Sequence, residues 1–358
     1  MGYIAESEEL FYGNFRTYKI IKGDTLQTVS QKLGIEAREL RRYHNIYCLD
    51  ADVIEKDFKH HCHFVILAPE KNDSAPVNEE DSLKKVSLGK DNKLPFLPRG
   101  ISRDYNVEYT LETGNQIDTM AMAVRVKWLA TDKNNCHLFE IKRSVNLFID
   151  DDLPDRMMDE MGTKMVEVLY PLKIVVDASG KWIDLYNYEE IVSRWEDKKK
   201  EVFDYYKKET LVSQEMIRFA EGALMSQEKL YDALRSDYFL RSFFNGIHTA
   251  YKENFLLTEE VSFPLEKNEE SIFKTEQNIK PHLNNDSLIE VEYKGYYLNA
   301  EDEINFEKKM WEGKYNAMYY LNFYSGFIEK MTLECNIDYD EPVKVKLVIE
   351  SLKKEKKE

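Results

Sequence analysis

The chain has 358 residues, and its 50 basic and 66 acidic side chains give a net charge of −16. An acidic surplus of this size opposes the phosphate contacts that nucleic acids and anionic membranes need, so neither partner is expected. Apolar residues make up 43% and aromatic residues 13% of the chain, which is typical of folded proteins. The length predicts two or three domains, each large enough to bury a core.

The four cysteines, Cys48, Cys62, Cys136 and Cys335, are too few and too scattered for a disulfide framework. The first residues are acidic where a signal peptide would be basic, and apolar runs no longer than about FVILA (64–68) are far from the roughly 18 residues of a membrane span. We therefore expect a cytoplasmic protein without a membrane span, which leaves the cell, if at all, by a route that needs no signal peptide.

Residues 17–69 follow an N-terminal extension (1–16) and read as strand, helix, helix, strand. Asp24 and Gln27 have the spacing of a helix capping box, and Gly34 is typical of a helix end. A second short helix is predicted over about residues 36–44, before the final strand HFVILAP.

The stretch YKIIKGDTLQTVSQKLGIEARELRRYHN resembles the LysM domain, a resemblance that covers roughly 15% of the chain. The positions that match the family pattern are Gly23, Asp24, Thr25, Leu26, Leu33, Gly34, Ile35, Leu40, Asn45 and Pro69. The resemblance implies binding of glycans that contain N-acetylglucosamine, such as peptidoglycan or chitin, in a shallow groove. The implied groove residues are Gly23, Asp24, Thr25 and Leu26 on one wall and Asn45, Ile46 and Tyr47 on the other.

The segment 54–69 departs from the family pattern, because it is about six residues longer and carries KHHCH where a short turn is usual. His60, His61, Cys62 and His63 are the one cluster of metal-capable side chains in the sequence. Neighbouring side chains in an extended segment point to opposite sides, so at most two could share a metal, whereas structural zinc needs four ligands. We therefore expect an exposed histidine-rich insertion, no metal site and no other cofactor.

A polar, proline-containing stretch over 70–100 predicts a linker, and the pattern beyond it is α+β. The elements expected in the larger domain (101–350) are strands at 104–112, 120–130 and 137–149, a helix from Pro154 to about Val168, a hairpin around 177–180, a helical insertion over about 187–250, a polar stretch over 266–287, and four further strands before a charged tail (351–358). Within the insertion, Asn187 with Glu190 predicts the cap of a long helix. We predict one antiparallel sheet, built from strands on both sides of the helical insertion, with helices packed on one face.

Four side-chain groups in this domain could serve function or only structure. Two acidic groups could supply paired carboxylates for hydrolysis or calcium, but helix capping and a solvated turn explain them better; they are Asp150, Asp151, Asp152 and Asp155, and Glu301, Asp302 and Glu303. A methionine stripe, Met157, Met161 and Met165, reads as the core side of a helix rather than a docking face. An aromatic run, Tyr315, Tyr319, Tyr320, Phe323, Tyr324 and Phe327, has one face to bury; Tyr319, Tyr320, Phe323 and Tyr324 are the partner-binding candidates.

The sequence contains no GxSxG, HExxH, phosphate-loop or dinucleotide-binding motif, so we expect no enzyme. The preferred hypothesis is a non-enzymatic adaptor, chaperone or effector-loading protein, similar to signal-less LysM proteins of bacterial contractile injection machines such as type VI secretion. Its partners would be proteins: an effector, a spike or a baseplate component. The alternative is a peptidoglycan-binding cell-wall protein or cargo, with or without a hydrolase domain; the lengthened segment 54–69 and the lack of a signal peptide disfavour it.

Overall fold

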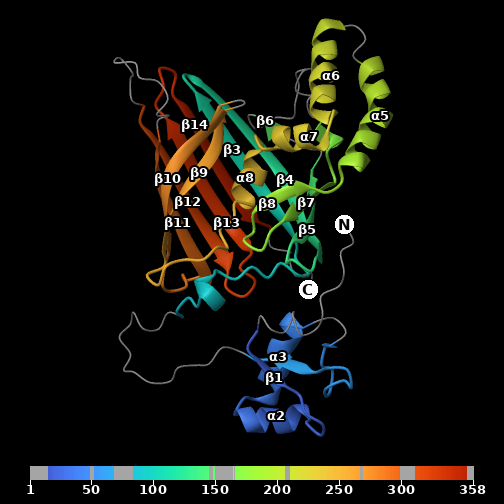
Figure 1. Ribbon diagram of the computed structural model, residues 1–358, viewed down its shortest axis with the longest axis vertical. Coiled ribbons are helices and arrows are strands. Elements are labelled where there is room, and N and C mark those ends of the chain that lie inside the picture. The colour runs from blue at the N-terminus through green and yellow to red at the C-terminus, as the bar shows by residue number, and fades with distance from the viewer. Residues whose placement is uncertain are drawn as a thin grey trace. The chain divides into compact units, whose positions relative to one another are not determined.

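The computed structural model divides the chain into two compact units, Met1–Glu79 and Glu80–Glu358, each of which is described here by itself (Figure 1). The residues that it describes are 15–48, 52–67, 84–144, 148–149, 164, 166–205, 210–266, 269–298 and 311–352.

The small unit has the predicted order of strand, helix, helix and strand. Its elements are β1 (Thr17–Lys19), α2 (Leu26–Leu33), α3 (Ala37–Tyr47) and β2 (Phe64–Ile66), and β1 pairs antiparallel with β2. A small apolar core lies between them, made of Leu26, Val29, Leu40, Ile54, Val65 and Leu67. Helix α2 is capped by Thr25 rather than by Asp24, because the Thr25 hydroxyl accepts a hydrogen bond from the Thr28 N–H at 3.2 Å. Gly34, with φ of 65°, ends α2 in the left-handed conformation.

The larger unit is built on one antiparallel sheet of twelve strands among the described residues. The strands are β3 (Ser102–Thr113), β4 (Gln116–Thr131), β5 (His137–Arg143), β6 (Phe148–Ile149), β7 (Leu172–Val176), β8 (Trp182–Leu185), β9 (Leu256–Glu266), β10 (Glu269–Ile279), β11 (Leu288–Tyr297), β12 (Gly313–Asn322), β13 (Ile328–Ile337) and β14 (Val343–Ser351). Their order is β8-β7-β5-β4-β3-β14-β13-β12-β11-β10-β9, and β6 pairs with β4 off this path. The predicted large antiparallel sheet, with strands from both sides of a helical insertion, is thereby confirmed.

Strands β9 and β10 are a difference from the sequence-based prediction, which placed a polar stretch over 266–287. Every second residue of β10 faces the interior, and three of these, Ser271, Thr275 and Gln277, are polar and buried. The sheet curls so strongly that Cα atoms of β9 lie within 8 Å of Cα atoms of β14.

The helical insertion supplies α5 (Tyr188–Tyr205), α6 (Thr210–Leu224), α7 (Gln227–Leu234) and α8 (Tyr238–Phe243). Helices α5 and α6 stand side by side beyond the β7–β8 end of the sheet (Figure 1). Asn187 directly precedes α5, and its side-chain nitrogen donates to Glu190 at 3.2 Å, the partner that the spacing indicated; its side-chain oxygen accepts the Lys173 N–H at 2.8 Å rather than an amide of the helix. Helix α8 packs on the sheet through Phe239 and Phe243, which are both buried.

The second half of the predicted linker is part of the larger unit. Val86 and Leu94 are buried in the core, and the short 3-10 helix η3 (Lys90–Asn92) lies between them. The backbone N–H of Leu94 donates to the carbonyl of Thr249 at 3.2 Å. This part of the predicted linker belongs to the larger unit because Val86, Leu88 and Leu94 pack in or against its core, although prolines and charged residues surround them in the sequence.

Several sequence-based predictions fall outside the described residues. These are the two acidic groups, the methionine stripe, most of the helix from Pro154, and residues 353–358 of the tail. In the part of the chain that the structure describes, no helix is both long and apolar enough to cross a bilayer.

Candidate functional site

The first wall of the predicted groove is the turn from Gly23 to α2, and its carboxylate is engaged within the chain. Asp24 accepts hydrogen bonds from the Lys32 ammonium at 2.7 Å, the Tyr18 hydroxyl at 2.9 Å and the Ile21 N–H at 3.1 Å. The hydrogen bond from Lys32, followed by that from the Ile21 backbone, lowers the pKa of Asp24. Gly23 has φ of 96°, which a glycine adopts without strain, so this wall is a fixed turn.

The start of α2 is covered by the lengthened segment 54–69. Asp57 from that segment accepts a hydrogen bond from the Leu26 N–H at 2.6 Å, and the Leu26 side chain is buried. The first amides of a helix lack partners within the helix and favour negative charge, which explains why a carboxylate binds here. The donor that the groove would offer at Leu26 is therefore already used.

The second wall is also tied to the lengthened segment. The Asn45 side-chain amide donates to the Ile54 carbonyl and accepts from the Ile54 N–H, both at 2.8 Å. This pair of bonds joins the end of α3 to the segment that follows. Ile46 and Tyr47 belong to α3 by their backbone. The polar groups of Asp24, Leu26 and Asn45 therefore stabilise the fold of the small unit.

A buried histidine connects α3 to β2 and to the loop that holds Asp52. His44 Nδ1 accepts the Ile66 N–H at 3.1 Å, so the ring must carry its proton on Nε2, which lies 3.1 Å from the Asp52 carbonyl oxygen. Burial lowers the pKa of His44, although the Asp52 carbonyl and carboxylate act in the opposite direction. His44 is therefore a neutral structural group at neutral pH.

The histidine-rich turn does not assemble a metal site in the described residues, where no three His, Cys, Asp or Glu side chains converge. His61 Nε2 lies 3.5 Å from Asp52 Oδ1, and Cys62 is buried with its thiol 3.4 Å from the Phe64 carbonyl oxygen. His60 and His63 are exposed. The turn could thus offer a metal at most isolated or paired ligands.

Among the partner-binding candidates of the larger unit, Tyr319 was predicted wrongly. Tyr319 is fully buried; its hydroxyl donates to the Ser242 carbonyl at 3.1 Å and accepts from Asn245 Nδ2 at 2.8 Å. It faces the inside of the curled sheet, where α8 packs. Tyr324 is exposed, whereas Tyr320 and Phe323 are half-buried, so these three residues form the accessible part of the aromatic run.

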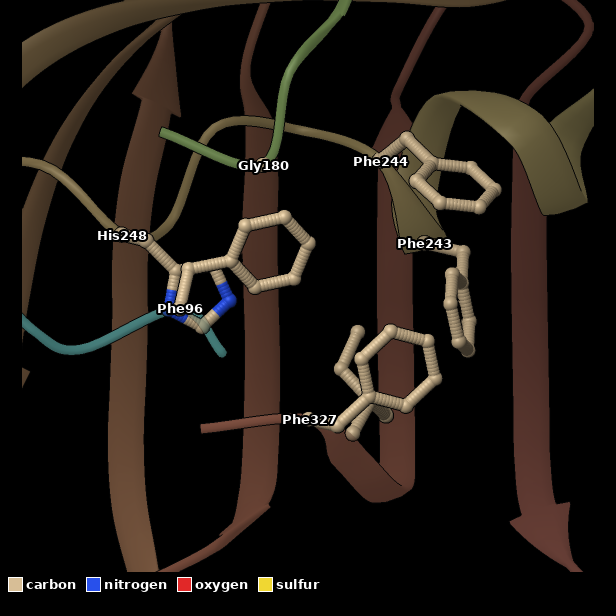
Figure 2. A pocket seen from close by; sticks show the side chains of 7 residues that line it. Phe96, Gly180, Phe243, Phe244, His248 and Phe327 are labelled. Carbon is tan, nitrogen blue, oxygen red and sulfur yellow. The ribbon is translucent and has the colours of Figure 1, made fainter. Parts of the chain in front are cut away.

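An aromatic cluster that includes Phe96, His248 and Phe327 lies beside the turn between β12 and β13 (Figure 2). The ring of His248 stacks on Phe96 at a centroid distance of 4.4 Å, and the ring of His137 lies nearly perpendicular to that of Phe96 at a centroid distance of 5.3 Å. Burial lowers the pKa of His248 to about 3 and that of His137 to about 4, so both rings are neutral at physiological pH. The cavity that Phe96, His248 and Phe327 help to line is about 10 Å³, which is room for no more than a single water.

A buried ion pair between Arg143 and Asp237 escaped the sequence analysis. The guanidinium Nη2 donates to Asp237 Oδ2, and the guanidinium also lies 5.0 Å from the ring centroid of Tyr170. Burial by itself lowers the pKa of Arg143, but the Asp237 carboxylate outweighs it and raises the pKa overall. The two residues are 94 positions apart, so no local pattern indicates their contact.

The outer face of strands β11 to β14 has a shallow hollow of about 490 Å³. Its floor includes Met318 and Val348, which are half-buried. The lysines at its border form ion pairs within the chain: Lys294 with Glu292 at 2.7 Å, and Lys346 with a neighbouring glutamate at 2.6 Å. These paired charges do not define a site for a charged small molecule.

No family model matches this chain, and no curated protein matches it.

Proposed function

We propose that the chain is a non-enzymatic adaptor whose LysM-like small unit and larger unit both contact proteins. In this proposal it serves as an assembly, chaperone or effector-loading component of a bacterial contractile injection machine of the type VI kind. The observation that carries the proposal is the contact of Asp57 with the Leu26 N–H, by which the chain itself covers one wall of the groove.

The energetics of this contact favour a protein partner over a sugar. A glycan acetamide oxygen that sought the Leu26 N–H would have to displace a carboxylate at 2.6 Å. A hydrogen bond to an ionised acceptor is roughly twice as strong as one to a neutral acceptor, so this exchange is unfavourable. On the other wall, the Asn45 amide would have to release both of its bonds to Ile54.

The larger unit would supply its own contact through the accessible aromatic residues. Tyr324 is 42% exposed, and its ring lies 5.1 Å from that of Phe323 in an edge-to-face arrangement. Aromatic side chains are enriched in protein interfaces because they bury a large area at little cost in side-chain entropy. An effector, a spike or a baseplate component is the partner class of this proposal.

The competing function is peptidoglycan binding, which the Gly-Asp-Thr-Leu turn and the order of elements in the small unit favour. Sedimentation of the full chain with insoluble peptidoglycan distinguishes the two functions. We expect the wild type to remain in the supernatant. Retention that Thr25→Ala abolishes would refute the adaptor proposal, and Thr28→Ala is the matched control because it breaks the same capping box.

The adaptor proposal also makes a positive prediction. The full chain should co-elute in gel filtration with a purified spike, baseplate or effector protein encoded beside its gene, and Tyr324→Ala should weaken that complex. Monomeric elution with every such protein, or loss of turbidity when the chain is added to purified cell walls, would contradict it.

A further inference from the structure

Strand β9 ends the sheet on one side, and its register shows which of its backbone groups are left over. The Ile279 N–H donates to the Phe255 carbonyl at 3.1 Å, so the odd-numbered residues of β9 bond to β10. The carbonyl of Ile272, which lies opposite Ser262, points the other way and accepts the Leu298 N–H at 2.8 Å. The N–H and C=O groups of the even-numbered residues in β9 therefore point away from β10.

Both ends of this outward side are occupied within the chain. At one end, the Lys252 N–H donates to the Leu256 carbonyl at 3.0 Å. At the other end, the Arg241 guanidinium donates to the Ser262 carbonyl at 2.5 Å, and residues 263–265 are buried. We call the stretch from Leu256 to Ser262 the β9 edge, because strand pairing from outside is limited to it.

The middle of the β9 edge is not shielded. The backbone N–H and C=O groups of Thr258 and Glu260 have no hydrogen-bond partner among the described residues, and both residues are exposed. Natural edge strands are usually short, bulged, covered or marked by proline or lysine, because free backbone groups accept a strand from another chain. The opposite edge strand, β8, is four residues long, and its Trp182 N–H donates to the Phe244 carbonyl at 3.1 Å. The β9 edge contains neither proline nor lysine, so its free groups form a template for pairing.

The two faces of the β9 edge differ in chemistry. On the inner face, Leu257 and Val261 are half-buried and pack against the core. Glu259 lies between them, and its carboxyl group is engaged by an amide of β10. Thr258 and Glu260 are on the outer face. Since side chains alternate along a strand, an added strand would place apolar side chains beside the inner face and polar side chains beside the outer one.

Negative charge exceeds positive charge around the β9 edge. On the neighbouring strand, Glu276 lies opposite Thr258 and Lys274 lies opposite Glu260. Together with residues 252–262, these two side chains make four glutamates against two lysines, and the whole chain carries −16. Opposite charges on paired strands are favourable and like charges are not, so this edge favours a basic strand.

We propose that the β9 edge binds an extended segment of a partner protein by antiparallel strand addition, with basic side chains on the outer face and apolar side chains on the inner face. Main-chain hydrogen bonds supply affinity in this mode, and the alternating side chains supply specificity. A second copy of the chain fits poorly. When two β9 edges overlap fully, Glu259 meets Glu259 and each Glu260 meets Thr258, so no opposite charges pair. The proposal does not depend on the proposed function.

Fluorescence anisotropy of a labelled peptide with the full chain tests the proposal. The probe has about seven residues, the length of the β9 edge, and alternates lysine and valine. It should bind saturably, and the matching peptide of glutamate and valine should bind about 10-fold or more weakly at low salt. In the proposed pairing the lysine amides face β9, so N-methylation of the lysines should weaken binding about 10-fold or more. N-methylation of the valines, whose amides face away, is the matched control and should have little effect.

Changes in the chain locate the binding. Thr258→Pro removes an outward N–H but leaves the bonds to β10, which the odd-numbered residues make, and it should raise the peptide Kd about 10-fold or more. Thr258→Ala keeps the N–H and should change the Kd less than about 2-fold. Amide exchange measured by NMR should be fast at Thr258 and Glu260 and slow at Glu259 in the free chain, and the peptide should protect the first two.

Four results would overturn the proposal. The amides of Thr258 and Glu260 could be protected in the free chain, which would mean that the chain itself covers the β9 edge. The lysine peptide could fail to bind, or bind no more tightly than the glutamate peptide. Methylated lysines and methylated valines could be tolerated equally, a comparison made on the unaltered chain and therefore independent of how Thr258→Pro folds. Finally, sedimentation could show a dimer that protects these two amides without peptide, which would make a second copy the partner.

Discussion

Asp237 performs two tasks in the larger unit, and replacing it should reveal both. Its Oδ1 atom caps α8 by accepting the Leu240 N–H at 2.9 Å, and its Oδ2 atom pairs with Arg143. The Asp237 and Arg143 side chains are only 16% and 15% exposed. Asp237→Asn keeps an oxygen for the cap but removes the charge, whereas Asp237→Ala removes both.

The magnitudes follow from burial. Breaking a buried ion pair on one side costs about 3 to 5 kcal/mol, because the remaining charge is left without a partner. The small exposure of Arg143 places Asp237→Asn near about 3 kcal/mol, and loss of the helix cap adds about 1 kcal/mol for Asp237→Ala. Combining Asp237→Asn with Arg143→Met removes the unpaired cation, so the double variant should recover much of the lost stability.

Urea unfolding followed by tryptophan fluorescence measures these changes in the larger unit alone. The four tryptophans, Trp128, Trp182, Trp195 and Trp311, all belong to it. If Asp237→Asn unfolds within about 1 kcal/mol of the wild type, the pair behaves as an exposed one and the reasoning from burial fails. The same conclusion follows if Arg143→Met brings no recovery in the double variant.

Three further predictions concern single contacts. Gly326→Ala should lower the free energy of unfolding by about 2 kcal/mol or more in the same fluorescence assay, because φ is 68° and the new Cβ would lie 1.9 Å from the Pro95 carbonyl oxygen. Gly114→Ala is the control, because φ is 58° but the space around it is open, and it should cost about 1 kcal/mol. Equal losses in the two variants would refute the clash at Gly326. Folding lowers the pKa of His44, so at low pH the unfolded state binds a proton that the folded state does not. The small unit should therefore lose stability as pH falls below about 6.5, by at most about 1.4 kcal/mol per pH unit. A flat pH profile in hydrogen exchange over residues 37–66 would contradict this. Asp57→Ala should destabilise the small unit by about 1 kcal/mol in that exchange measurement, and unchanged protection of α2 would argue against the contact.

The sequence predicts strands well where apolar residues alternate, and it fails where the interior is polar. In β11 to β14 the inward residues are almost all apolar or aromatic, and all four strands were predicted. In β10 the inward positions include Thr275 and Gln277, and Gln277 hydrogen-bonds with Tyr251 inside the sheet. Because these polar groups find partners only in the folded unit, the hydrophobic pattern that identifies a strand is missing from β10.

The candidate site shows the same limit. The predicted turn at Gly23 and the helix after it are present, because local spacing is enough to specify them. The contact from Asp57 to the Leu26 N–H spans 31 residues, so no local motif could indicate that the lengthened segment covers the turn. For the aromatic run, alternation predicted that one face is buried, but the side on which Tyr319 lies depends on where α8 packs.

The pairing of β14 with β3 has a consequence for biosynthesis. These two strands lie side by side in the middle of the sheet, although one is near the beginning and the other near the end of the larger unit. Before β14 is synthesised, the strands from β3 to β8 and the strands from β9 to β13 form two separate groups. Only β14 pairs with both β3 and β13 and joins the groups into one sheet. Until Ser351 has emerged, the nascent unit therefore has two more open sheet edges, β3 and β13, than the finished sheet, and in this period a chaperone would protect it from aggregation.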